Sequence, residues 1–220
     1  MRLVLGTSVR CTDGKFGELA DVVIDPVHKR LTHVVVRGHH GDLGMARLVP
    51  FALVQADGEH QISLRCSVDE ACSLDPVQDF AYLRIDERPP ADPKWDVGIE
   101  NVLAMPTYPT SDLGNYAVGY DENVGIAYDR VPKGKVEIRR SSPVSTSDGH
   151  AVGHVDGFLV DGTDQITHLL LERGHLWRRR EVAIPMEAIT KVETDSVTVG
   201  LTTREVGQLP SVPAHRRHRA

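Results

Sequence analysis

The chain has 220 residues, a formal net charge of −6 at pH 7, and 40% hydrophobic, 25% charged and 5% aromatic residues. This length allows one compact domain or two small ones, and the composition is that of an ordinary soluble protein. No apolar run approaches the roughly 20 residues that span a bilayer, and the opening MRLVLGTSVR lacks the apolar stretch and cleavage site of a secretory signal. We therefore expect a cytoplasmic protein without a transmembrane segment.

Residues 1–72 have the pattern of a small strand-rich unit. The dipeptide Asp13-Gly14 predicts a tight hairpin turn, because glycine adopts positive φ without steric cost, and the segments around it alternate between apolar and polar residues. Residues 31–36 (LTHVVV) are apolar and β-branched and predict a central strand, and Pro50 ends the next strand. Five or six short strands in about 65 residues favour a small closed or half-closed barrel, since an open sheet would leave exposed edges.

The three cysteines, Cys11, Cys66 and Cys72, all lie in this first unit. An odd number of cysteines without a C-x-x-C pair is typical of neither a disulfide framework nor a zinc site. We therefore interpret them as small, partly buried apolar side chains.

Residues 73–134 form a connecting segment that is rich in proline, glycine and tyrosine and has no counterpart elsewhere in the chain. It holds all five tyrosines and Trp95, whereas a disordered linker would be poor in aromatic residues. Residues 73–138 carry 6 Lys+Arg and 12 Asp+Glu, so the acidity of the chain is concentrated here, which is not the pattern of a general nucleic-acid binder. We predict an ordered but irregular segment packed on the barrels, with one short amphipathic helix over 77–85.

Residues 135–212 repeat the first unit. The block ITHLLL at 166–171 matches LTHVVV at 31–36 position for position, and Pro185 follows its block at the same distance as Pro50 follows the first. Several blocks in the same order at a nearly constant offset indicate a tandem duplication. The predicted fold class is therefore all-β, with two small barrels in tandem related by a pseudo-two-fold axis.

The order of these blocks resembles the PRC-barrel domain: G-x-x-V, then D-G, G-x-v-x-D, a strand containing T-H, v-P-x-x-x-v and i-x-l. The resemblance covers residues 3–72 and 139–210. The family occurs in the photosynthetic reaction centre H subunit and in the C-terminal half of a ribosome-maturation factor. The resemblance implies a β-barrel that makes protein–protein or protein–RNA contacts, without shared catalytic residues.

Two groups of histidines are candidate metal ligands. His33 and His168 are equivalent in the two units and would give a pseudo-symmetric site, since imidazole is a common ligand. A half-buried histidine in each barrel, with its ring bonded to a carbonyl, explains them as well. The loop containing His39, His40 and Asp42 places two imidazoles and a carboxylate close together in the sequence. The alternative for this loop is a solvated turn.

The corresponding hairpin of the second unit is a candidate partner-binding patch, formed by His175, Trp177, Arg178, Arg179 and Arg180. A tryptophan beside three arginines can make cation–π contacts and bind phosphate. The alternative is an exposed hairpin whose charges pair with the acidic segment. The basic tail, residues 213–220, is predicted to be disordered and could contact RNA, an anionic membrane surface or an acidic partner.

The sequence contains none of the common catalytic signatures: no G-x-S-x-G elbow, P-loop, dinucleotide fingerprint or H-E-x-x-H. We therefore expect a non-enzymatic adaptor or scaffold that binds a protein partner and needs no cofactor. Two alternatives stay open: a small-ligand or metal-binding protein that uses the cleft between the barrels, and an RNA-associated protein. The sequence leaves the oligomeric state open between monomer and homodimer.

Overall fold

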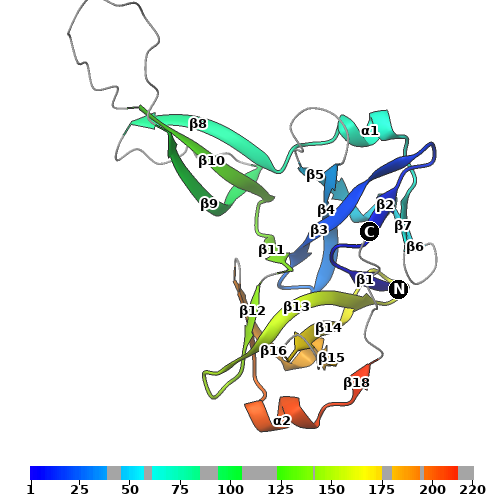
Figure 1. The fold of residues 1–220 in the computed structure, drawn as a ribbon, viewed down its shortest axis with the longest axis vertical. Helices are drawn as coiled ribbons and strands as arrows, with labels where there is room; N and C mark the ends of the chain where they lie inside the picture. Colours follow the sequence, from blue (N-terminus) through cyan, green and yellow to red (C-terminus); the bar gives the residue numbers. More distant parts are fainter. Residues whose placement is uncertain are drawn as a thin grey trace, which may run out of the picture.

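The computed structural model describes residues 1–38, 46–56, 61–84, 94–105, 123–140, 142–174, 180–193 and 196–212. These residues form an all-β fold with two short helices, α1 (Val68–Cys72) and α2 (Thr203–Gln208), and two single 3-10 turns, Phe51–Leu53 and Met186–Ala188. Figure 1 shows one sheet from the first third of the chain, one from the last third, and a smaller sheet from the middle that extends away from both. Within the described ranges, no helix is long and apolar enough to cross a bilayer.

The first sheet has the strand order β5-β4-β3-β2-β7-β6. Its strands are β2 (Ser8–Arg10), β3 (Lys15–Asp25), β4 (Arg30–Gly38), β5 (Ala46–Pro50), β6 (Val54–Ala56) and β7 (Ile62–Leu64). β2 and β7 run parallel, and the other neighbours in this order are antiparallel. The predicted central strand is confirmed as the middle of β4, which lies between β3 and β5.

The last third of the chain forms a second sheet with the order β16-β17-β12-β13-β14-β15-β18. Its strands are β12 (Pro143–Ser145), β13 (Ala151–Val160), β14 (Ile166–Arg173), β15 (Arg180–Pro185), β16 (Ile189–Glu193), β17 (Ser196–Val199) and β18 (Ser211–Val212). From β16 to β15 the order repeats that of the first sheet, including a parallel pair, β12 with β17. The all-β prediction is confirmed. The described strand pairs do not close either sheet, so the closed barrels stay a prediction.

The two halves exchange one strand each. β1 (Arg2–Val4) lies at the start of the chain but pairs with β13 of the second half, with Leu3 opposite Phe158. β11 (Val136–Arg139) precedes the second half but pairs with β3 of the first, with Ile138 opposite Val22. These four side chains belong to one apolar cluster that runs through both halves, and each is at most 1% exposed. The halves therefore share a core instead of folding around two separate ones.

A glycine near the start of each long strand lets two backbones approach closely. A Cβ on Gly17 would lie 2.0 Å from the carbonyl oxygen of Arg37, and a Cβ on Gly153 would lie 2.2 Å from that of Glu172. Any larger residue would push β3 away from β4, or β13 away from β14. This contact explains the glycine that follows the Asp-Gly turn in both halves of the sequence.

A short helix with a closed N-terminal turn follows β7 in the first half and β17 in the second. In α1, Ser67 and Glu70 form a capping box, and the Asp13 carboxylate accepts a hydrogen bond from the Val68 backbone N–H at 2.9 Å. The second half repeats both features with Asp148, Thr202, Thr203 and Glu205. These helices are not among the predicted elements, although the S-x-x-E and T-x-x-E spacings are the signal for such a cap.

The middle of the chain contains a three-stranded antiparallel sheet instead of the predicted irregular segment. Its strands are β8 (Gln78–Arg84), β9 (Trp95–Met105) and β10 (Asn123–Pro132), in the order β8-β10-β9. The predicted helix over 77–85 is wrong, because β8 pairs along its whole length with β10 and this non-local pairing overrides local propensity. The base of this sheet packs on the outer face of the first sheet, in an apolar cluster of Val23, Val35, Leu48, Val77 and Val131.

Candidate functional site

Two turns, one from each half, interlock where the halves meet. Lys29 and Asp164 occupy equivalent positions in the two halves and are the two non-glycine residues with positive φ, 54° and 64°, in the described parts of the chain. The Leu31 N–H donates to the Asp164 carbonyl at 3.2 Å, and the Ile166 N–H donates to the Lys29 carbonyl at 3.1 Å. This reciprocal pair holds both left-handed residues in place. The contact between the halves therefore fixes the shape of both turns.

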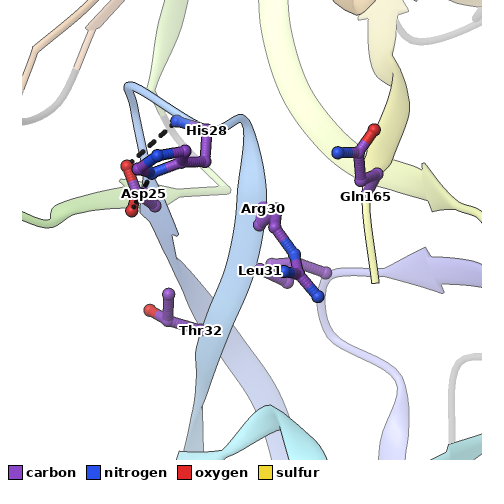
Figure 2. A pocket seen from close by; sticks show the side chains of 6 residues that line it. All are labelled: Asp25, His28, Arg30, Leu31, Thr32 and Gln165. Carbon is purple, nitrogen blue, oxygen red and sulfur yellow. Dashed lines mark hydrogen bonds and ion pairs between the residues drawn. The ribbon is translucent and has the colours of Figure 1, made fainter. Parts of the chain in front are cut away.

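A pocket of about 450 Å³ opens beside this junction. Figure 2 shows Gln165 on the opposite side from Asp25 and His28, with Arg30 between them in this view. Its full lining is Asp25, His28, Arg30, Leu31, Thr32 and Gln165. All but Gln165 come from the first half, so the pocket depends on the contact between the halves.

Among the charged side chains around the pocket, Arg30 is the main group that can bind a ligand. The Asp25 carboxylate accepts hydrogen bonds from the Lys135 ammonium at 2.6 Å and from the His28 ring at 2.9 Å. These contacts hold the pKa of Asp25 well below its usual range. This carboxylate is therefore ionised and its charge is balanced. The Arg30 guanidinium donates a hydrogen bond to the Thr163 carbonyl at 3.0 Å, and the remaining N–H groups of its fork can serve a small polar or anionic ligand.

The two equivalent histidines occupy the same place in each sheet. His33 lies opposite Val23 and Pro50, and His168 lies opposite Leu159 and Pro185. Burial lowers the pKa of His33, so its ring is neutral at pH 7. The ring nitrogen Nδ1 of His168 lies 3.1 Å from the Thr167 hydroxyl, which is a hydroxyl contact in place of the expected carbonyl.

No metal site is assembled among the described residues, which contain no group of three or more His, Cys, Asp or Glu side chains able to hold an ion. His33 and His168 are thus not brought into such a group. The other candidate ligands, His39, His40 and Asp42, lie outside the described residues, so the metal site in that loop stays a prediction.

Only the base of the predicted partner-binding hairpin is described. His175, Trp177, Arg178 and Arg179 lie outside the described residues, as does the tail 213–220. Arg180 begins β15, is exposed, and lies directly opposite Arg173 at the end of β14. The hairpin therefore starts from two arginines placed side by side.

Buried carboxylates on the second sheet were not predicted from the sequence. Glu181 is 3% exposed, and both of its oxygens accept hydrogen bonds at 2.6 Å from Arg2 of the exchanged strand β1. Asp156 is 6% exposed, and burial together with the nearby negative charges of Glu181 and Glu172 raises its pKa to about 6. These acids alternate with apolar residues like any exposed strand residue, so only the three-dimensional pairing with β1 reveals their burial.

Comparison with protein families matches residues 140–205 to the PRC-barrel domain. This range contains the start of α2 and the strands β12 to β17, which make up most of the second sheet. The family expected from the sequence is therefore found in the second half. A search among curated proteins finds no match to the chain.

Proposed function

We propose that this chain, whose residues 140–205 are a PRC-barrel domain, is a non-catalytic adaptor made of two such repeats, and that it binds an acidic protein segment at the β14–β15 hairpin. The observation that carries this proposal is the pair of arginines, Arg173 and Arg180, directly opposite each other at the base of that hairpin. Neither has a carboxylate partner among the described residues.

The tandem duplication in this proposal has three supports. The two sheets have the same strand order, both Asp-Gly turns bind the start of a capped helix, and the turns at the junction pair reciprocally. The two copies have also diverged at their hairpins. At the corresponding hairpin of the first half, between β4 and β5, Arg37 lies opposite Ala46. This pair therefore has no repulsion between like charges. When a duplicated domain gains a new binding partner, its surface residues at the binding site are expected to change while its fold stays the same.

The arginine pair is the reason for expecting an acidic partner. Like charges directly opposite each other on neighbouring strands destabilise a sheet, so the pair lowers stability until an anionic group lies between them. Arg178 and Arg179 extend the same hairpin in the sequence and add charge of the same sign. A partner carboxylate or a phosphorylated segment would be bound bidentately by such guanidinium groups.

Charge reversal at the hairpin base tests the adaptor function. The variant Arg173→Glu/Arg180→Glu is expected to lose its main bound protein by about tenfold or more when the full chain is used to capture partners from its source cell. The matched control is Arg37→Glu, an exposed arginine on the corresponding hairpin of the first half, which should capture the partner as the wild type does. Equal capture by all three proteins would contradict the proposal, as would a bound RNA whose affinity falls steeply with salt.

Ligand binding in the pocket between the halves is a second candidate function. The observation in its favour is that about 450 Å³ of space, lined from both halves, lies within the range of small-molecule sites. We expect an anionic metabolite to raise the melting temperature of the wild type, because a ligand that binds only the folded state stabilises it. Arg30→Ala should remove this increase and Arg37→Ala should retain it. A metabolite library that shifts neither the wild type nor Arg30→Ala, or shifts both equally, argues against this candidate.

A further inference from the structure

Two cysteines that are distant in sequence meet at one end of the first sheet. Cys11 follows β2 and Cys66 follows β7, the two strands that run parallel. The Thr12 backbone N–H and hydroxyl both donate to the Cys66 carbonyl, at 3.0 and 3.2 Å, so the two chain segments are joined here. Both cysteines are free and buried, at 6% and 8% exposure. They belong to the same apolar cluster.

The two thiols share buried surroundings. Burial raises the pKa of both, and the nearby Cys66 side chain adds to the increase at Cys11, whose pKa reaches about 12. Both thiols are therefore protonated at neutral pH. The expectation of buried cysteines holds for these two, but their proximity was not predicted, because the long separation in the sequence gives no sign of it.

The second half shows that the fold does not need sulfur at this place. Thr146 and Leu201 occupy the positions equivalent to Cys11 and Cys66, and the Ser147 N–H donates to the Leu201 carbonyl at 3.0 Å, just as Thr12 does to Cys66. Thr146 is 2% exposed, so this position is buried in both halves. The same backbone arrangement thus forms with a hydroxyl and an aliphatic side chain. The thiol pair is a property of the first half alone.

We propose that Cys11 and Cys66 are a redox-dependent modification site, which forms an internal disulfide bond when the protein meets a low-molecular-weight disulfide. The thiolate of one cysteine attacks the reagent R–S–S–R, and R–S⁻ leaves and takes up a proton. The second thiolate then attacks the cysteine sulfur of this mixed disulfide and expels the other R–S⁻. Two thiols lose two electrons and two protons, and the reagent becomes two R–SH molecules, so the exchange balances.

The bond would join the end of β2 to the residue that precedes the Ser67 cap of α1. It would close a long loop that contains β3 to β7. A disulfide that closes a long loop strongly lowers the conformational entropy of the unfolded chain. Because Thr12, the residue after Cys11, already donates two hydrogen bonds to the Cys66 carbonyl, the folded chain holds the two cysteines close together before the bond forms. The oxidised protein is therefore expected to melt about 5–10 °C higher than the reduced protein.

Oxidation of the full chain with glutathione disulfide tests this site. After the exchange is stopped with acid and the free thiols of the denatured protein are blocked with a maleimide, peptide mapping should recover a Cys11–Cys66 cross-link. A reductant should remove both the cross-link and the gain in melting temperature. The rate of disulfide formation should rise about tenfold per pH unit between about pH 7 and 9, since only the small thiolate fraction reacts. Cys72→Ser should behave as the wild type.

The matched negative control is Cys11→Thr/Cys66→Leu, which takes the residues of the second half and should fold without any shift on oxidation. Recovery of unlinked Cys11 and Cys66 after prolonged oxidation at high pH would overturn the proposal. So would a cross-link that uses the exposed Cys72 in place of either buried cysteine.

Discussion

Leu3→Ala is expected to lower the free energy of unfolding by about 3 kcal/mol and to loosen the second half of the molecule more than the first. Leu3 is completely buried and lies opposite Phe158 of β13, although it stands almost at the start of the chain. Shortening a buried leucine to alanine costs about 2–5 kcal/mol, because apolar contacts are lost and a cavity remains. Urea unfolding measures the total loss, and hydrogen exchange locates it.

The reciprocal substitution, Ile138→Ala, is the control for this exchange of strands. Ile138 lies opposite Val22 of β3 and is 1% exposed. The free energy of unfolding should therefore fall by a similar amount, but the hydrogen-exchange protection should be lost at the amides of β3 and β4. Both variants should still unfold in a single transition, because one apolar cluster runs through both halves. If Leu3→Ala exposed the amides of β3 and β4 and left those of β13 protected, the shared core would be refuted.

Strand exchange bears on the proposed adaptor function. Two barrels joined only by a linker could change their relative orientation, whereas here each half supplies a strand and a turn to the other. A partner bound at the β14–β15 hairpin would therefore be held in a fixed position relative to the middle sheet, which packs on the first half. Rigid spacing between binding surfaces is what a scaffold needs.

The repeat pattern predicted the local structure well and the long-range pairing poorly. Residues 31–36 and 166–171 lie inside β4 and β14, and prolines end β5 and β15, as their residue types require. The same pattern could not show that β1 and β11 pair with the opposite half, since an apolar strand does not encode its partner. The helix expected over 77–85 failed for the same reason, because β10, its partner, begins at Asn123.

The candidate sites were predictable to the extent that they depend on position within the repeat. His33 and His168 are equivalent in the structure as they are in the sequence. The proximity of Cys11 and Cys66, the pocket at the junction and the buried ion pair of Arg2 with Glu181 were not predictable, because each joins residues that are far apart in the sequence. Spacing within a motif carries no information on such contacts.

The strongest pH-dependent effect is expected at another unpredicted acid, in the variant Asp156→Asn. The pKa of Asp156 is about 6 in the folded protein against the ordinary 3.8, so the folded state binds more protons than the unfolded state between these values. The wild type therefore loses stability as the pH rises from about 4 to about 6, and the loss is complete above this range. Asp156→Asn removes the buried charge and should raise the free energy of unfolding at pH 8 by about 2–3 kcal/mol.

The opposite sign is expected for Asp161→Asn, which makes it a useful comparison. Asp161 is exposed, and hydrogen bonds from the Thr163 hydroxyl and backbone N–H lower its pKa. Its contribution to stability is present at neutral pH and is lost as the pH falls below about 4, so the asparagine variant should be less stable than the wild type at pH 8. Urea unfolding from pH 4 to pH 8 measures both. If Asp156→Asn left the slope between pH 4 and 6 unchanged, then the Asp156 carboxyl would not be the group that binds the proton.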